Sequence, residues 1–238
     1  MAADSLLLSQ GIPTLRFYGW ERETISLGKH QPSELGLTQD PFQSIPKVRR
    51  PTGGRAVLHA NPSQELTYAL VMPHLAEQGL GQREAAYRHL CEFLRRGLAH
   101  LGIPLDDWIP RGHRSRAIPA RLSQRTSCFA TQTAADLTYQ GQKIIGSAQV
   151  WGRGVVLQQG SILLQPDRER WSQLWHQDPH RVIGLQEILG SPIQTSQLIE
   201  ILVQAATDVF GIPWQVQDWI PAEQSAIQHI AANFQISE

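Results

Sequence analysis

The chain has 238 residues, of which 41% are hydrophobic, enough to bury one good-sized core, so we expect a single domain over residues 1–238. Acidic and basic residues are equal in number, 21 each, and this balance excludes the bulk positive charge of many nucleic-acid-binding proteins. The two cysteines and nine histidines form neither a disulfide framework nor a metal-ligand spacing, so we expect no bound metal.

Short runs rich in β-branched and aromatic residues, bounded by turn residues, predict strands at 14–18, 23–27, 47–58 with an internal turn, 66–72, 136–139, 142–150 and 155–164. Apolar residues at helical spacing predict helices at 2–9, 83–101, 196–210 and 223–233. Short turns separate most neighbouring strands, which favours antiparallel pairing. The predicted fold class is therefore α+β, with a mixed, largely antiparallel sheet and flanking helices.

The start of the chain shows no membrane or export signal. The leucine run at residues 6–8 is far too short to span a membrane. Asp4 precedes it, where a secretory signal carries positive charge. We expect a cytoplasmic monomer without membrane contact.

A glycine pair interrupts the strand-like run at 47–58. Because glycine has no Cβ atom, the backbone there can turn tightly as a hairpin or approach a ligand closely as a cradling loop. Cationic and titratable residues surround the pair and favour an anionic group nearby. They are Arg49, Arg50, Arg55 and His59.

Cys128 and Lys143 suit acyl-transfer chemistry if the fold brings them together. A cysteine thiolate attacks thioesters readily, and a nearby cation lowers the pKa of a thiol from its usual value of about 8.5. The Lys143 ammonium would supply that charge, or would stabilise negative charge on the acyl carbonyl oxygen. Exchanging a thioester for an amide is downhill, so this chemistry needs no ATP, and the chain has no P-loop motif.

Each of these residues also has a purely structural interpretation. A free cysteine is most often a small buried hydrophobe, and Cys91, beside the apolar stripe of the helix at 83–101, fits that description. Lys143 would otherwise be the solvated tip of a hairpin, although the small residues at 146–148 suit a strand that passes close to a ligand. A lone histidine such as His59 is usually a hydrogen-bonded part of the scaffold.

Several ordered segments resemble the biotin/lipoate protein ligase superfamily, over at least residues 1–165. The resemblance implies the catalytic domain of that superfamily, in its lipoate-protein ligase A-like branch. The segments are Arg50-Pro-Thr-Gly-Gly-Arg-Ala-Val-Leu-His59, Glu65-Leu-Thr-Tyr-Ala-Leu70, Cys128-Phe129, Gly141-Gln-Lys-Ile-Ile-Gly-Ser-Ala-Gln149 and Leu157-Gln-Gln-Gly-Ser161.

Two branches of this superfamily differ in chemistry. ATP-dependent lipoate ligases carry a third glycine after the glycine pair and need no cysteine nucleophile. This chain has Arg55 at that position and Cys128 before the lysine motif, so it resembles the cysteine-dependent octanoyltransferases. The resemblance implies transfer of an octanoyl or lipoyl group from acyl carrier protein, through a thioester on Cys128, to a lysine of a lipoyl domain or of the glycine cleavage carrier protein.

Three alternatives stay open at this point. The first is an ATP-dependent lipoate-protein ligase that acts through lipoyl-AMP and would need ATP and Mg²⁺. The second is an amidotransferase that moves the acyl group between lipoyl-carrier proteins. The third is a lipoyl-binding module without catalysis.

The matching positions imply a site. Cys128 and Lys143 are its expected catalytic residues, and no cofactor is expected. The expected substrate-binding residues come from three motifs: Arg50, Thr52, Gly53, Gly54, Arg55, Ala56, His59, Gly146, Ser147, Ala148, Gln149, Gly160 and Ser161.

Two further features concern partners and substrate. Five arginines and a histidine lie between Arg111 and Arg125 without a carboxylate, so this segment is either a solvated loop or a docking surface for acidic carrier proteins. Gln159 stands where the family pattern has a histidine, and residues 61–63 form an insertion after His59. These departures leave the details of the substrate open.

Overall fold

The computed structural model describes residues 1–32, 42–75, 77, 79–108, 136–175 and 181–236. The predicted helices and most predicted strands are present, with ends that shift by one or two residues. In chain order the elements are α1 (Ala2–Gln10), β1 (Thr14–Tyr18), β2 (Thr24–Leu27), β3 (Lys47–Arg49), β4 (Val57–His59), β5 (Glu65–Pro73), α2 (Arg83–His100), β6 (Leu137–Tyr139), β7 (Gln142–Trp151), β8 (Val155–Leu163), α3 (Arg168–Trp175), α4 (Leu185–Leu189), α5 (Thr195–Phe210), α6 (Pro221–Ala231) and a 3₁₀ turn (Ala232–Phe234).

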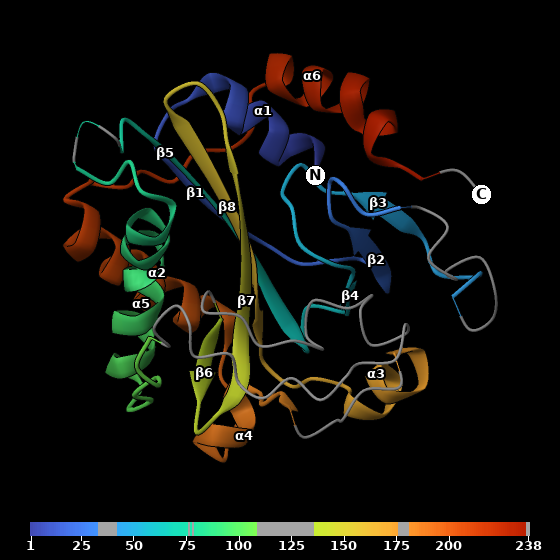
Figure 1. Ribbon diagram of the computed structural model, residues 1–238, viewed down its shortest axis with the longest axis vertical. Helices are drawn as coiled ribbons and strands as arrows, with labels where there is room; N and C mark the ends of the chain where they lie inside the picture. The colour runs from blue at the N-terminus through green and yellow to red at the C-terminus, as the bar shows by residue number, and fades with distance from the viewer. Residues whose placement is uncertain (33–41, 76, 78, 109–135, 176–180, 237–238) are drawn as a thin grey trace.

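Within the described ranges the strands form two sheets (Figure 1). The larger sheet has the order β1-β5-β8-β7-β6, and every neighbouring pair in it is antiparallel. The smaller sheet has the order β3-β2-β4, with β3 parallel and β4 antiparallel to β2. The α+β class and the largely antiparallel sheet predicted from the sequence are confirmed.

The predicted strand pair at 47–58 is not a hairpin. Its two halves, β3 and β4, lie on opposite edges of β2 and do not pair with each other. Backbone hydrogen bonds explain the crossing, because Arg50 N–H donates to the Leu27 carbonyl and Lys29 N–H donates to the Thr52 carbonyl, each at 2.9 Å. The segment between β3 and β4 therefore passes over the end of β2 as a loop, which was the second of the two sequence interpretations.

One face of the larger sheet packs against α2 and α5, and the other face is covered by α1 over one part and lines a cavity over another. Alternate residues of a strand point to opposite sides, so β5 sends one set of side chains toward α2 and α5 and the other toward α1. Tyr68 and Leu70 belong to the first set, and Ala69 and Val71 belong to the second. Nearer the start of β5, Thr67 belongs to the second set and lines a cavity.

Helices α2 and α5 pack tightly against each other beside the larger sheet (Figure 1). A Cβ atom on Gly97 of α2 would lie 2.6 Å from Leu202 Cδ2 of α5, so the two helices approach as closely as a glycine allows. No helix in the described part of the chain is both long and apolar enough to cross a membrane.

Cys91 lies in this helical layer with its side chain fully buried, as its place beside the apolar stripe predicted. Burial raises the pKa of the Cys91 thiol to about 12, so the group is protonated at any pH where the protein is handled. We expect iodoacetamide at pH 8 to leave Cys91 unmodified in the native protein and to alkylate it after denaturation, as peptide mass spectrometry would show. Alkylation of native Cys91 at the rate of a free thiol would contradict this burial.

The end of the described chain returns to the smaller sheet. Gln235 forms an isolated antiparallel bridge with Val48 of β3, and Ile236 N–H donates to the Lys47 carbonyl at 3.1 Å. Ile236 also packs against the apolar cluster that includes Ile25 and Leu27. The outer edge of β3 is thus paired rather than open.

Candidate active site

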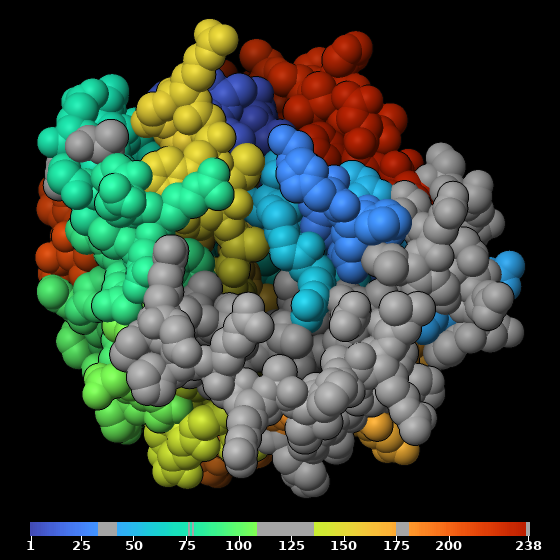
Figure 2. All heavy atoms as spheres, in the orientation of Figure 1, coloured from blue at the N-terminus to red at the C-terminus, as the bar shows by residue number. Residues whose placement is uncertain are grey.

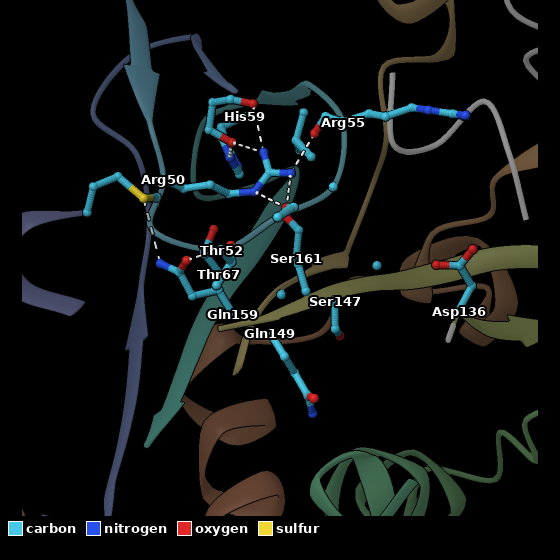
Figure 3. Close-up of a pocket in the computed structure, with 18 of the residues that line it drawn as sticks. Arg50, Thr52, Arg55, His59, Thr67, Asp136, Ser147, Gln149, Gln159 and Ser161 are labelled. Carbon is cyan, nitrogen blue, oxygen red and sulfur yellow. Dashed lines mark hydrogen bonds between the residues drawn. The ribbon is translucent and has the colours of Figure 1, made fainter. Parts of the chain in front are cut away.

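A cavity of about 450 Å³ lies between the two sheets. On this face of the molecule, the β7–β8 hairpin and the segment between β3 and β4 lie side by side (Figure 2). Figure 3 shows the cavity and the labelled side chains around it. Its lining residues are Met1, Tyr18, Ser26, Arg50, Thr52, Gly53, Gly54, Arg55, Val57, His59, Thr67, Tyr87, Asp136, Lys143, Gly146, Ser147, Ala148, Gln149, Gln159, Gly160 and Ser161.

The cavity brings the separated motifs together. Of the residues that we expected to bind substrate, all except Ala56 line it. The Ala56 side chain is instead fully buried in the apolar cluster between the smaller sheet and α3, so its methyl group packs the scaffold and does not reach a ligand. Cys128 and the arginine-rich segment at 111–125 lie outside the described residues.

Strand register explains how the two later motifs share the cavity. In the β7–β8 pair, Gly146 lies opposite Ser161, and Ser147 lies opposite Gly160. A Cβ atom on Gly160 would lie 2.4 Å from Tyr68 Cε1 and 2.7 Å from Ser147 Oγ. Glycine at this position therefore lets the Tyr68 ring pack across β8, where the Tyr68 hydroxyl and Ser147 Oγ hydrogen-bond at 2.7 Å.

Arg50 holds the loop between β3 and β4 in place. Its side chain is 5% exposed, and it donates to the carbonyl oxygens of Ser26, Gly53 and Arg55 at 2.6 to 3.2 Å. These hydrogen bonds fix the two glycines at the cavity wall. Apart from Gly53 itself and its two chain neighbours, no described atom lies within 4 Å of the place where a Cβ on Gly53 would be, so this position faces open space.

Lys143 is a buried cation at the start of β7. Its side chain is 6% exposed, and its Nζ lies 2.6 Å from Oδ1 of Asp136, whose side chain is 4% exposed. Both residues line the cavity. The solvated hairpin tip considered for Lys143 is wrong, because the turn is formed by Gln140 and Gly141, which precede it.

This geometry can be compared with known proteins. A family model described as the lipoyl protein ligase A/B catalytic domain matches residues 1–207. The chain belongs to this family. The membership confirms the superfamily that the motifs predicted.

Relatives along nearly the whole chain carry one name, octanoyltransferase LipM. The relative from Exiguobacterium sibiricum is 30% identical over 257 residues, which cover 100% of this chain and 92% of the relative. The relative from Moorella thermoacetica is 32% identical over 237 residues, which cover 93% of this chain and 84% of the relative.

Two solved structures of the lipoate ligase type share the fold. A lipoate-protein ligase A bound with ATP has a TM-score of 0.74 and 19% identity, covering 96% of this chain and 87% of that one. A bipartite lipoate protein ligase from Thermoplasma acidophilum has a TM-score of 0.70 and 18% identity, covering 96% and 85%. These likenesses establish the family's catalytic-domain architecture for this chain.

Gln159 joins three elements of the fold. Its side-chain nitrogen donates to Asp4 Oδ2 at 2.5 Å, and its side-chain oxygen accepts a hydrogen bond from Thr52 Oγ1 at 3.0 Å. Asp4 is fully buried and forms an ion pair with Arg16 at 2.7 Å. The glutamine therefore ties α1 and the glycine loop to β8, a role that needs one donor and one acceptor at once.

Asp136 is the main cavity residue that sequence reasoning missed. The signal was present, because Asp136 begins the first strand of a predicted hairpin whose second strand carries Lys143. In the β6–β7 pair Lys143 lies opposite Thr138, so Asp136 comes two residues earlier along the neighbouring strand. Long side chains at such diagonal positions can still meet, and the Lys143 ammonium reaches the Asp136 carboxylate at 2.6 Å.

Within the described ranges, no three histidine, cysteine, aspartate or glutamate side chains lie close enough together to hold a metal ion.

Proposed function

We propose that this protein is an octanoyltransferase of protein lipoylation, with acyl carrier protein as donor and a lysine of a lipoyl domain or of the glycine cleavage carrier protein as acceptor. The observation that carries the proposal is that motifs far apart in the sequence line one cavity, in a chain that matches octanoyltransferases along its length. Cavities of this volume are typical of sites for small ligands.

Cys128 is the proposed nucleophile of the first half-reaction. Its thiolate attacks the thioester carbonyl of the octanoyl donor, and a bond forms between Cys128 sulfur and the acyl carbon. The carbon–sulfur bond to the carrier breaks, and the carrier leaves as a thiol after it takes up a proton. The product is an octanoyl thioester on the enzyme.

The acceptor lysine completes the transfer in the second half-reaction. Its neutral amine attacks the enzyme thioester, an amide bond forms, and the bond to Cys128 sulfur breaks. Cys128 leaves as a thiolate, and the proton that the amine loses balances the one that the carrier took up in the first half-reaction. Since an amide is more stable than a thioester, the sequence runs without ATP, and we propose that no cofactor takes part.

Lys143 is the proposed electrostatic group of both half-reactions. Its buried ammonium lines the cavity, and the Asp136 carboxylate at 2.6 Å holds it there. A cation in a site of low dielectric constant stabilises the negative charge that develops on a carbonyl oxygen more strongly than it would in water. The ion pair therefore fixes the cation before the substrate arrives.

Intact-mass spectrometry tests the proposal directly. After incubation with octanoyl carrier protein without ATP, we expect the protein to gain one octanoyl group that hydroxylamine removes. The Cys128→Ala variant should gain none. The absence of an adduct on the native protein, together with modification of a lipoyl domain once ATP and free lipoate are supplied, would establish an ATP-dependent ligase instead.

A further inference from the structure

A buried carboxylate that does not itself line the cavity controls several side chains that do. We propose that Glu65 is a positioning residue for the acyl chain: it turns the hydroxyl protons of Thr67 and Ser161 away from the cavity, so that a wall made of polar residues accepts an apolar chain. The inference rests on the proposed octanoyl transfer.

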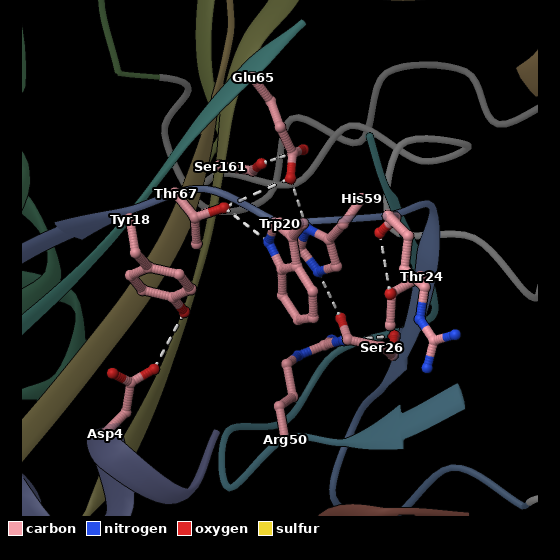
Figure 4. Close-up of polar contacts among 11 residues, drawn as sticks. Asp4, Tyr18, Trp20, Thr24, Ser26, Arg50, His59, Glu65, Thr67 and Ser161 are labelled. Atoms are coloured by element: carbon pink, nitrogen blue, oxygen red, sulfur yellow. Dashed lines mark hydrogen bonds and ion pairs between the residues drawn. The ribbon is translucent and has the colours of Figure 1, made fainter. Parts of the chain in front are cut away.

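Glu65 accepts hydrogen bonds from three directions (Figure 4). The Ser161 hydroxyl donates to Oε2 at 2.6 Å, and the Thr67 hydroxyl donates to Oε1 at 3.3 Å. His59 Nδ1 lies 2.8 Å from Oε1. The Glu65 side chain is 2% exposed, so these protein groups take the place that water would have around a carboxylate.

The hydroxyl group of Thr67 is fixed in direction by Trp20 as well as by Glu65. Trp20 Nε1 donates to Thr67 Oγ1 at 3.0 Å, which leaves the Thr67 proton for Glu65. The Trp20 ring stacks on the His59 ring with centroids 4.1 Å apart and planes 13° apart. Thr67 is therefore held at both its donor and its acceptor, and its methyl group is what it can offer to a ligand.

The histidine side of the network leads to the glycine loop. Arg50 Nη1 donates to Ser26 Oγ at 3.2 Å, and Ser26 Oγ lies 2.8 Å from His59 Nε2. An imidazole with its proton on Nδ1 satisfies every group, because Ser26 then donates to Nε2 and His59 donates to Glu65. In this arrangement each group donates a hydrogen bond to the next, from Arg50 through Ser26 and His59 to Glu65.

This direction has a consequence for the cavity. Ser26, His59, Thr67 and Ser161 all line it, yet each uses its proton on another residue of the network. A wall whose hydroxyl protons are already paired presents methyl and methylene groups to a ligand without leaving a buried donor unsatisfied. An octanoyl chain, which has no acceptor along its length, requires a wall of this kind.

Glutamine at position 65 reverses part of this arrangement. It has nearly the shape of glutamate, but one of its two terminal atoms is a donor. The amide nitrogen would donate to Ser161 Oγ, and the Ser161 proton would then turn toward the cavity. Glu65→Gln should therefore weaken binding of the octanoyl chain while Lys143 and Cys128 keep their chemistry.

The test measures acylation of the enzyme by octanoyl carrier protein in single-turnover experiments. We expect Glu65→Gln to raise the half-saturating donor concentration about tenfold and to change the maximal acylation rate less than threefold. In a Ser161→Ala background the same substitution should raise that concentration less than threefold, because the hydroxyl that it misdirects is absent.

Two controls separate this role from folding. Leu202→Ala, in the contact between α2 and α5, should lower the melting temperature without changing the half-saturating concentration. Glu65→Asp serves as the second variant if Glu65→Gln does not fold, because it keeps the negative charge. Aspartate is too short to hold Ser161 and His59 together, so this variant should also raise the half-saturating donor concentration.

The possible failures are distinguishable. If the native protein is not acylated, the proposed function is wrong. If the native protein is acylated but the position-65 variants have its half-saturating concentration, the role of Glu65 is wrong. An equal effect of Glu65→Gln in the native and Ser161→Ala backgrounds would also overturn the inference.

Discussion

Replacing Lys143 by methionine is expected to slow acylation of the enzyme by about 10²- to 10³-fold, the range seen when a group that stabilises an oxyanion is removed. Methionine keeps the unbranched side chain at nearly the same length and removes its charge. The buried ammonium lines the cavity, 2.6 Å from Asp136, so its loss removes a fixed positive charge from the cavity in which we propose that the acyl carbonyl reacts.

The same substitution should also destabilise the fold. Removing one member of a buried ion pair costs about 3–5 kcal/mol when the other charge stays buried. Asp136 would keep its charge with its side chain 4% exposed and without the ammonium partner. Urea unfolding followed by circular dichroism measures this loss.

A second substitution separates the two effects of Lys143. In the double variant Lys143→Met, Asp136→Leu, both charges of the ion pair are replaced by apolar side chains, so we expect most of the stability to return. The acylation rate should stay low, because the cation is still missing. A rate that recovered together with stability would show that Lys143 acts only as part of the scaffold.

Gly28→Ala is expected to lower acylation about 100-fold, although residue 28 does not line the cavity. A Cβ at this position would lie 2.0 Å from the Gly54 carbonyl oxygen and 3.2 Å from the Gly53 carbonyl carbon. These are backbone atoms, so the loop between β3 and β4 must move to make room. A shift of about 1 Å in a positioning element is enough for a loss of this size.

Gly152→Ala provides the matched control for this prediction. The nearest atom to its added Cβ, the Val155 carbonyl oxygen, lies at 3.6 Å, which is an ordinary contact. It should leave the acylation rate unchanged and alter the free energy of unfolding by less than about 0.5 kcal/mol. A Gly28→Ala enzyme with the native rate would mean that the exact course of the loop does not matter for catalysis.

Most of the fold followed from local patterns. The strands of the larger sheet and helices α2 and α5 were predictable because apolar periodicity and turn residues agree there. Two short helices, α3 and α4, were not predicted. They lie among residues 166–195, where the apolar side chains serve local packing, as Trp171 does in the cluster beneath the smaller sheet.

The path of the glycine loop could not be derived from local pattern. Two strands joined by a glycine pair suit a hairpin, and only contacts with a third strand decide otherwise. Those contacts come from β2, some twenty residues earlier, and from the hydrogen bonds of Arg50 across it. The same long-range geometry moves Ala56 from the cavity into the core.

The site was predictable as a set of motifs but not as a network. The glycine, lysine and arginine residues of the motifs indicated the cavity wall, because a glycine in a strand often lies where a ligand approaches the backbone, and a charged side chain there can bind a ligand. Glu65 gave no such signal, since a glutamate that begins a strand is usually solvated. Its importance appears only when the fold brings His59 and Ser161 to it, beside Thr67 of its own strand.

The pairing of Gln235 and Ile236 with β3 determines how far this chain can be truncated. The family match ends at residue 207, but Gln235 and Ile236 cover the outer edge of the strand that leads into Arg50. A fragment ending at 207 would expose that edge and open the apolar cluster that Ile236 helps to cover. For this protein, the boundary of a minimal soluble fragment is therefore set by an edge strand near the start of the chain, not by the extent of sequence similarity.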